Sequence, residues 1–303
     1  MKEDKRCIIG VDIGGTFFRI GAVDREQNIL QFQKVRVRNV IHSENVLDDL
    51  CNFLIDFMTK VPYKAEGISI GFPATIDRNR TMVVQAPNIR FMEQLPVKKY
   101  LEDAFHIPVY VERDVCMTME YDLQKYHIPD CELVTGCYFG TGIGNAVYLN
   151  GRPLLGKNGA AGEIGHIPVD GSKKICGCGN VGCMESLAGG KYLNELAENA
   201  FTGLPIGEIF TVHGNDPRLK KFVQRMAQTV ATEINILDPD YMIIGGGVPN
   251  MKDFPKEYFI EMTHKYVRKP FPEQNLTLIF AEDLEEKSVI GAALYARKMK
   301  EKA

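Results

Sequence analysis

The sequence predicts an α/β protein made of two related halves. Near its start, an apolar stretch at residues 7–12, the glycine pair 14–15 and a second apolar stretch at 18–23 form the pattern of two strands joined by a tight turn. The same order returns at residues 133–149, where the turn is again rich in glycine. Helical patterns lie between and after these strands, so ligands are expected at the strand ends or between the halves.

Periodicity places the remaining elements. Apolar residues at 46–58 repeat with a helical period, so this segment should bury one face. Further helices are expected to end near Phe105 and to occupy residues 218–237 and 288–300, and further strands to occupy 67–71, 108–112 and 241–244. Asp114 then stands between a strand and a helix. The predicted lobes are residues 1–116 with 288–303, and residues 117–287, which include a cysteine cluster.

Composition and charge favour a small-molecule partner. The 303 residues include 36 Lys and Arg against 39 Asp and Glu, so no excess of positive charge points to nucleic acid or to an anionic membrane surface. No apolar run approaches the ~20 residues of a membrane span, and the start lacks the pattern of an export signal. A cytoplasmic, reducing location is therefore expected, in which the eight cysteines are thiols or metal ligands rather than disulfides.

Three glycine-rich turns are candidate phosphate-binding sites. Consecutive glycines expose backbone N–H groups and leave room for an anion, although a tight turn that needs glycine also explains any single one of them. The turns at residues 12–16 and 140–144 have neither the pattern of a Walker loop nor that of a dinucleotide fingerprint. Because a carboxylate repels phosphate unless a cation lies between them, Asp12 beside the first turn predicts Mg²⁺. The candidate ATP-binding residues are Asp12, Gly14, Gly15 and Thr16, then Gly140, Thr141, Gly142 and Gly144, and finally Gly245, Gly246 and Gly247.

A cysteine cluster predicts a structural zinc site. The donor set of a closed tetrahedral Zn²⁺ site is offered by His166, Cys176, Cys178 and Cys183, with glycines between the cysteines that allow tight turns. Unligated thiols or a disulfide are the alternatives. The other cysteines lie in apolar patterns and are expected in the core, and they are Cys7, Cys51, Cys116, Cys131 and Cys137.

Asp114 is the candidate general base. A carboxylate at a strand end can accept the proton of an attacking hydroxyl, but an aspartate at the start of a helix also serves as an N-cap. Glu163, His166 and Glu185 lie close to the zinc ligands in sequence or among them, and together they offer partners for several hydroxyls of a sugar. Asn88 adds a donor and an acceptor from a loop, although the Pro-Asn pair is also ordinary turn chemistry.

These motifs together resemble those of the ROK family, which comprises repressors, open reading frames and sugar kinases. The resemblance covers residues 7–295 and rests on Asp12-Ile13-Gly14-Gly15-Thr16, Gly71-Phe72-Pro73, Pro87-Asn88, Gly140-Thr141-Gly142-Ile143-Gly144, Ala161-Gly162-Glu163-Ile164-Gly165-His166, the cysteine cluster and Gly245-Gly246-Gly247-Val248. It implies a two-lobed actin-like (ribonuclease-H-like) ATPase fold with mixed sheets, binding of ATP with Mg²⁺, and a homodimer. It also implies that Asp114 is the base and that the hexose is held by Gly71, Asn88, Glu163, His166 and Glu185.

Two residues depart from the usual family pattern. Arg113 stands where most members have an asparagine that contacts the sugar, and an arginine only donates hydrogen bonds. The segments Arg113-Asp114-Val115 and His166-Ile167-Pro168 are most similar to the D-allose kinases of the family. The reaction that this resemblance implies is transfer of the γ-phosphoryl group of ATP to the 6-hydroxyl of D-allose. Phe17 replaces a common lysine, which leaves open which cation lies near the first turn.

Three alternative functions are kept. Glucokinase or N-acylmannosamine kinase activity would use the same fold with a different sugar. A sugar-responsive repressor would carry a helix-turn-helix ahead of the first glycine turn, and only eleven residues precede Asp12. A non-catalytic sugar-binding module would have no use for Asp114 and the phosphate turns.

Overall fold

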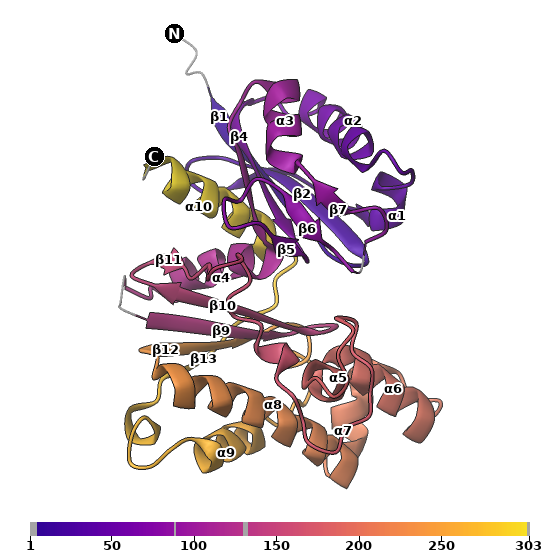
Figure 1. Ribbon diagram of the computed structural model, residues 1–303, viewed down its shortest axis with the longest axis vertical. Helices are drawn as coiled ribbons and strands as arrows, with labels where there is room; N and C mark the ends of the chain where they lie inside the picture. Colours follow the sequence, from indigo (N-terminus) through magenta and orange to yellow (C-terminus); the bar gives the residue numbers. More distant parts are fainter. Residues whose placement is uncertain (1–4, 88, 130–132, 302–303) are drawn as a thin grey trace. The chain divides into compact units, whose positions relative to one another are not determined.

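The computed structural model describes residues 5–87, 89–129 and 133–301, and the chain divides into two units (Figure 1). The first unit comprises Met1–Pro129, Leu155–Ala161 and Leu284–Ala303, and the second comprises Asp130–Leu154 and Gly162–Asp283. Helix α4 (Asp114–Lys125), which crosses the lobe boundary expected at residue 117, lies whole within the first unit. The lobe boundaries expected from the sequence stay a prediction.

The first unit is built on a five-stranded mixed sheet of order β3-β2-β1-β4-β8. Strands β1, β2 and β3 are antiparallel neighbours, whereas β4 and β8 run parallel to β1. Cys7 and Ile9 of β1 face the core that includes α2 and α3, and Ile8 faces α10. The strands are β1 (Arg6–Ile13), β2 (Phe17–Val23), β3 (Ile29–Arg36), β4 (Lys64–Phe72) and β8 (Val109–Arg113). Helices α1 (Val37–Val40), α2 (Val46–Thr59), α3 (Val97–Phe105), α4 and α10 (Lys287–Glu301), and the small sheet β5 (Thr75–Ile76), β6 (Val83–Gln85) and β7 (Glu93–Leu95), complete the unit.

The second unit repeats this sheet topology with the order β11-β10-β9-β12-β13. Again the first three strands are antiparallel neighbours and the last two run parallel to the central one. The strands are β9 (Leu133–Phe139), β10 (Ile143–Leu149), β11 (Arg152–Pro153), β12 (Tyr241–Gly245) and β13 (Leu278–Phe280). The helices are α5 (Glu185–Ala188), α6 (Gly190–Ala200), α7 (Ile209–His213), α8 (Pro217–Leu237) and α9 (Lys256–Tyr266), with single 3-10 turns at Ile164–His166, Ile206–Glu208 and Glu273–Asn275.

The repeated topology confirms the prediction of two related halves and of an α/β fold with mixed sheets. The helix predicted at 46–58 is α2, and those predicted at 218–237 and 288–300 are α8 and α10. The helix at 46–58 was the first element expected after the strand at 18–23, but a third strand, β3, comes between them. This strand lies at the edge of its sheet, and none of its residues is fully buried. Its polar and apolar residues therefore alternate only weakly, and the sequence did not predict it.

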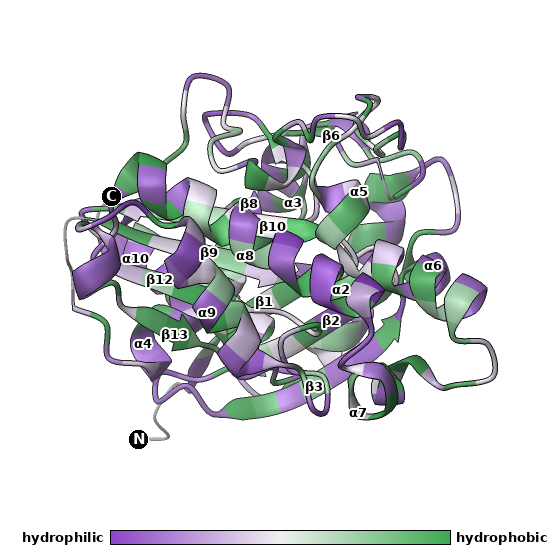
Figure 2. Cartoon of the chain, turned by 90° about the horizontal axis from the view of Figure 1, so that it is seen from below, coloured by the Kyte–Doolittle hydropathy of each residue, from purple (hydrophilic) through white to green (hydrophobic). Residues whose placement is uncertain are grey.

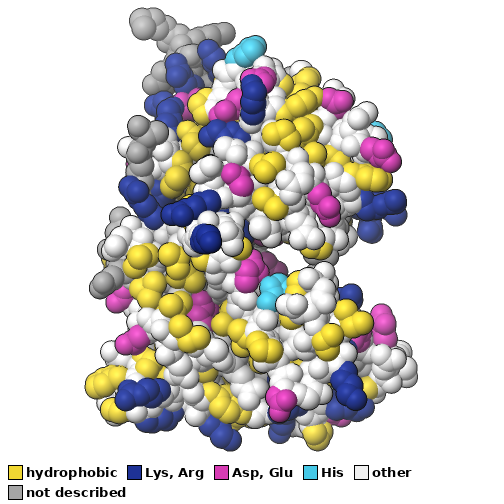
Figure 3. Space-filling model, viewed as in Figure 1, with side chains coloured by type: hydrophobic (Ala, Val, Ile, Leu, Met, Phe, Trp, Pro, Cys, Tyr) yellow, Lys and Arg dark blue, Asp and Glu magenta, His cyan; other side chains and the backbone are white. Residues whose placement is uncertain are grey.

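Helix α8 illustrates how the sequence sets an element. Asp216 occupies the N-cap and accepts a hydrogen bond from the N–H of Arg218, and Pro217 follows at the first helical position. Within the described chain, no helix is both long and apolar enough to cross a bilayer, and the helices carry hydrophilic and hydrophobic residues side by side (Figure 2). Acidic and basic side chains are interspersed on the face shown in Figure 3, as the balanced composition predicts.

Candidate active site

Asp12 lies at the end of β1, next to the first glycine turn, and is buried. Its Oδ2 accepts hydrogen bonds from Arg19 Nη1 at 3.0 Å and from Ser288 Oγ at 2.8 Å. Burial raises the pKa of the Asp12 carboxyl, while Arg19 and Ser288 act in the opposite direction. Sequence reasoning missed both partners. The signal for Arg19 is its place directly opposite Asp12 in the antiparallel pair of β1 and β2.

Two cations of β3 lie over the ring of Phe17, which follows the first turn. Lys34 Nζ lies 4.5 Å from the centroid of the Phe17 ring, and the guanidinium carbon of Arg36 lies 5.5 Å from it. Lys34 stands opposite Arg19 across the two strands and forms an ion pair with Glu285. Arg19, Lys34 and Arg36 therefore supply positive charge where the family pattern usually has a lysine.

Asp114 is the first residue of α4 and follows directly on β8, as predicted. The N-cap position belongs to Arg113, and Asp114 instead accepts a hydrogen bond from the N–H of Val115 on Oδ1, at 2.7 Å. The Asp114 side chain is half-buried. A Cβ at Gly71, near the end of β4, would lie 2.9 Å from the Asp114 Cα, so the close approach of the two segments requires glycine there.

Arg113 is buried next to Asp114. Its backbone N–H donates to Glu112 Oε1 at 2.8 Å, and its Nη2 lies 3.9 Å from Cys116 Sγ. The arginine that distinguishes this chain from the usual family pattern is thus packed among the residues that carry Asp114. Asn88, the other sugar ligand expected from this part of the chain, lies outside the described residues.

The second glycine turn joins β9 to β10 in the second unit. The N–H of Gly140 donates to Gly142 O at 3.1 Å, and the N–H of Ile143 donates to Glu185 Oε2 at 2.8 Å. A Cβ at Gly142 would lie 2.1 Å from the same carboxylate oxygen, so any larger residue would displace Glu185 from the N–H of Ile143. Glu185 and the second turn, which the sequence suggested separately, are therefore one structural unit.

The start of α6 covers the second turn, and sequence reasoning missed it. The N–H of Gly190 donates to Gly140 O at 2.8 Å, and the N–H of Lys191 donates to Thr141 O at 2.9 Å. A Cβ at Gly190 would lie 2.5 Å from Gly140 O. The signal in the sequence is Gly189-Gly190-Lys191 ahead of a helical pattern, since the N-terminus of a helix attracts anions.

The third glycine turn follows β12 and packs against the end of β9. Gly246 has a φ of 92°, and Asn250 Nδ2 donates to its carbonyl oxygen at 3.0 Å. The N–H of Val248 donates to Phe139 O at 3.0 Å. Because Phe139 ends the strand that leads into the second turn, the second and third turns lie at the same edge of the sheet.

The predicted zinc ligands come together in the second unit. One donor atom from each of His166, Cys176, Cys178 and Cys183 lies within 4.8 Å of all the others. Cys178 Sγ and Cys183 Sγ are 3.6 Å apart, and Cys176 Sγ is 3.6 Å from His166 Nδ1. A tetrahedral ion with ~2.3 Å bonds to sulfur and ~2.0 Å bonds to nitrogen needs separations of ~3.8 and ~3.5 Å. The four side chains therefore fit Zn²⁺ in donor type and spacing.

The other cysteines follow the expected pattern where the structure describes them. Cys7, Cys116 and Cys137 are buried and Cys51 is half-buried, all as thiols, while Cys131 lies outside the described residues. Burial raises the pKa of the Cys7 thiol to about 11 and that of Cys116 to about 12, so both are protonated at neutral pH.

His166 connects the cysteine cluster to Glu163. Its Nδ1 faces Cys176, whereas its Nε2 lies 3.6 Å from Glu163 Oε2. A histidine that binds a metal through one ring nitrogen commonly presents the other to a carboxylate, which sets the ring orientation. Glu185 Oε1 lies 3.8 Å from Cys176 Sγ, so the two glutamates expected to hold the sugar both border the cluster.

The chain is similar in sequence and in fold to proteins of one known family. The model of the ROK family matches residues 8–299, and the chain therefore belongs to the ROK family. A glucokinase of Thermotoga maritima is 26% identical, over 95% of this chain and 96% of that protein. An N-acetylmannosamine kinase of Shigella flexneri is 25% identical, over 96% of this chain and 98% of that protein. The crystal structure of a ROK family glucokinase from Streptomyces griseus in complex with glucose and AMPPNP superimposes with a TM-score of 0.80 at 25% identity, covering 96% and 99% of the two chains.

Proposed function

We propose that the protein is an ATP-dependent hexose kinase that phosphorylates the 6-hydroxyl of D-allose. The observation that carries the proposal is the place of Asp114, a half-buried carboxylate where β8 ends and α4 begins, with Gly71 of the neighbouring strand against it. Membership of the ROK family supports the kinase chemistry, since similar family members include a glucokinase and an N-acetylmannosamine kinase.

In this reaction Asp114 accepts the proton of the sugar 6-hydroxyl. The sugar oxygen forms a bond to the γ-phosphorus as the bond from that phosphorus to the β–γ bridging oxygen breaks, and the products are a hexose 6-phosphate and ADP. A positioned base contributes ~10²- to 10⁴-fold to the rate. Mg²⁺ bound with ATP would neutralise charge on the phosphates, and Asp12 is the carboxylate that would bind it.

The three glycine turns are the proposed ATP-binding segments. Arg19 beside Asp12 adds positive charge at the first turn, and Lys191 at the start of α6 adds positive charge at the second. Asn88, Glu163, His166 and Glu185 are the proposed ligands of the sugar hydroxyls. Zn²⁺ on the cysteine cluster would hold the loop that carries His166, because this loop has few buried apolar residues of its own.

Arg113 is the residue that favours D-allose over D-glucose in this proposal. A guanidinium only donates hydrogen bonds and keeps its charge, whereas the asparagine usual in the family both donates and accepts. Arg113 is buried beside Asp114, so its size and charge bear on the shape of the sugar site next to the base. A sugar that differs from glucose in the orientation of one ring hydroxyl is the kind of substrate that such a change selects.

Turnover of ATP to ADP against a panel of sugars tests the proposal. The purified, zinc-loaded protein is assayed with D-allose, D-glucose, D-mannose, N-acetyl-D-mannosamine and N-acetyl-D-glucosamine, and Asp114→Asn is the matched control. We expect the highest kcat/KM with D-allose, and a loss of at least ~100-fold in kcat for Asp114→Asn with its circular dichroism unchanged. A higher kcat/KM with D-glucose or N-acetyl-D-mannosamine would overturn D-allose as the substrate and would support the kinase reaction. An absence of ADP formation with every sugar would overturn the kinase proposal.

A further inference from the structure

Arg80 lies in the turn between β5 and β6 and directs its side chain into the first unit, where only 11% of it is exposed. The turn is shaped by Asp77, whose carboxylate accepts hydrogen bonds from the N–H groups of Thr81 and Met82, both at 2.7 Å. Arg78, two residues earlier, is exposed. Two arginines of one short turn thus have opposite surroundings.

The Arg80 guanidinium joins three segments of the first unit. Its Nε donates to Glu112 Oε2 at 2.9 Å, which forms a buried ion pair. Its Nη1 donates to the carbonyl oxygens of Ile76, Asp77 and Gly159, at 3.1, 3.2 and 3.2 Å. The planar donor fork of an arginine can serve several acceptors in this way, and a lysine ammonium lacks its geometry.

Glu112 links Arg80 to strand β8, which leads directly into Asp114. It lies in β8 two residues before Asp114, and its side chain is completely buried. Its Oε1 accepts the N–H of Arg113 at 2.8 Å, and its Oε2 also accepts the hydroxyl of Tyr295 at 3.2 Å. Removal of Arg80 would leave a buried carboxylate without its cation, and the backbone around it would have to move to admit water.

Gly159 connects the same guanidinium to a second part of the proposed site. It lies in Leu155–Ala161, the segment that belongs to the first unit although the residues before and after it belong to the second. Gly159 has a φ of 76°, and a Cβ there would lie 2.3 Å from Ile76 O and 2.8 Å from Arg80 Nη1. This segment leads directly into Glu163, one of the proposed sugar ligands.

We propose that Arg80 is a positioning residue of the kinase reaction. Through Glu112 it holds the strand end that presents Asp114, and through Gly159 it holds the segment that leads into Glu163. The inference rests on the proposed function for its kinetic consequence, but the anchoring of residues 155–161 by Arg80 is a structural statement that is tested without any substrate.

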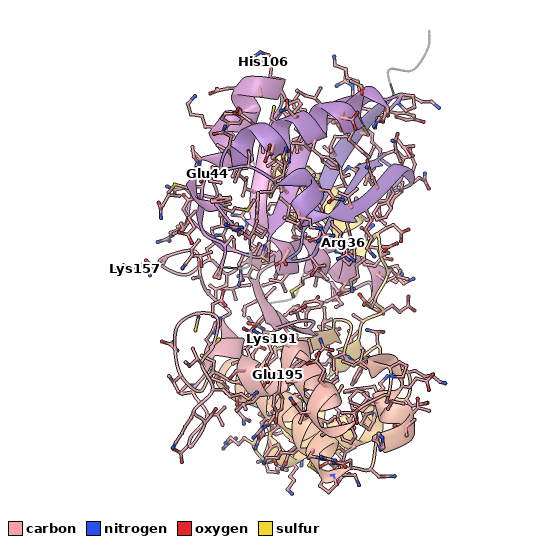
Figure 4. All side chains as sticks on the ribbon, turned by 90° about the vertical axis from the view of Figure 1, so that its right-hand side faces the viewer. Arg36, Glu44, His106, Lys157, Lys191 and Glu195 are labelled. Atoms are coloured by element: carbon pink, nitrogen blue, oxygen red, sulfur yellow. The ribbon has the colours of Figure 1, made fainter. Side chains whose placement is uncertain are left out.

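Limited proteolysis tests the anchoring. Lys157 is exposed and points away from the ribbon (Figure 4), so the bond after it is a trypsin site within the anchored segment. We expect Arg80→Met to raise the rate of cleavage between Lys157 and Asn158 at least ~10-fold. Arg78→Met, in the same turn, should leave this rate unchanged. The rates of cleavage after other exposed lysines should be unchanged in both variants. Equal rates for the two variants at Lys157 would overturn the inference.

Kinetics of the same variants test the positioning role. We expect Arg80→Met to lower kcat with the preferred sugar ~10²-fold, because displacement of a base by about an ångström has an effect of this size. The KM for ATP should stay within about two-fold, and Arg78→Met should match the natural protein. Arg80→Lys should recover little, and Glu112→Gln should add little to Arg80→Met, because both changes act through one ion pair. A kcat for Arg80→Met equal to that of Arg78→Met would overturn the positioning role. A natural protein that phosphorylates no sugar would instead count against the proposed function, and the proteolysis result would still decide whether Arg80 anchors the segment.

Discussion

Replacement of Glu233 by glutamine should change how the stability of the second unit depends on pH. Glu233 lies on α8 and is 3% exposed, and both its carboxyl oxygens accept hydrogen bonds from Asn145 Nδ2, at 2.8 and 2.9 Å. Burial raises the pKa of the Glu233 carboxyl from its ordinary value of 4.5 to about 8, and the bonds from Asn145 offset this only in part. The charge of Glu233 also contributes to the raised pKa of the nearby Cys137 thiol.

The sign of the effect follows from where the proton is bound. Between pH 4.5 and about 8 the unfolded chain has released a proton that the folded chain keeps at Glu233, so the free energy of unfolding falls as pH rises through this window. The loss approaches ~1.4 kcal/mol per pH unit, which amounts to ~3 kcal/mol between about pH 5 and about pH 7.5. Glutamine has almost the same shape and no proton to lose, so the variant should lack this loss.

Urea unfolding followed by far-ultraviolet circular dichroism measures the effect, because the chain has no tryptophan to report by fluorescence. The free energy of unfolding of Glu233→Gln, minus that of the natural protein, should grow by ~3 kcal/mol over this pH range. Glu261→Gln, an exposed change on α9 of the same unit, is the matched control and should show no such growth. A difference for Glu233→Gln that stays constant, or that shrinks as pH rises, would refute the reasoning.

Three further predictions concern metal and packing. Cys178→Ser, or treatment with a chelator, should abolish stoichiometric zinc measured by mass spectrometry and lower the unfolding temperature by several degrees, and an unchanged zinc content would exclude the proposed ligand set. Gly142→Ala should lower the unfolding temperature measurably, since its Cβ would lie 2.1 Å from Glu185 Oε2 and displace that oxygen from its hydrogen bond with the N–H of Ile143, whereas Gly140→Ala has open space and should not. Lys287→Met removes the cation of a buried ion pair and should lower the free energy of unfolding in urea by ~3–5 kcal/mol. Lys60→Met, in an exposed pair, should lower it by less than ~1 kcal/mol. Similar losses for the two variants would contradict the role of burial.

The sequence predicted those elements whose period is set by burial. The helix expected at 46–58 is found at Val46–Thr59 because one of its faces packs into the core. Strands β9 and β12, buried at almost every position, were equally recognisable. Two edge strands, β3 and β11, escaped prediction, since β3 is only partly buried and β11 has two residues, so neither carries a clear alternation. Strand β8 is also at a sheet edge, but it is buried at most positions and was predicted.

The candidate site was predictable where its residues are neighbours in sequence. The zinc ligands fall within residues 166–183, and their convergence depends on local turns. Ser288, by contrast, is separated from Asp12 by 276 positions in the sequence, and no periodicity in either segment predicts their hydrogen bond. From the sequence, Glu112 is a strand residue and Arg80 a turn residue, and nothing in the pattern connects them. The packing of β5 against β8 brings them together.

The two related glycine turns have different lengths and are surrounded by different side chains, since four residues separate the paired residues Ile13 and Phe18 and three separate Phe139 and Ile143. In each turn, the N–H of the first glycine donates a hydrogen bond within the turn. Gly14 donates to Phe17 O, and Gly140 donates to Gly142 O. At the first turn the nearby carboxylate of Asp12 is paired with Arg19. At the second turn a carboxylate, Glu185, takes a backbone N–H for itself, and the positive end of α6 lies alongside. The glycine pattern therefore predicts that both segments turn tightly, but it does not predict which carboxylate and which positive group come to each turn from elsewhere in the chain.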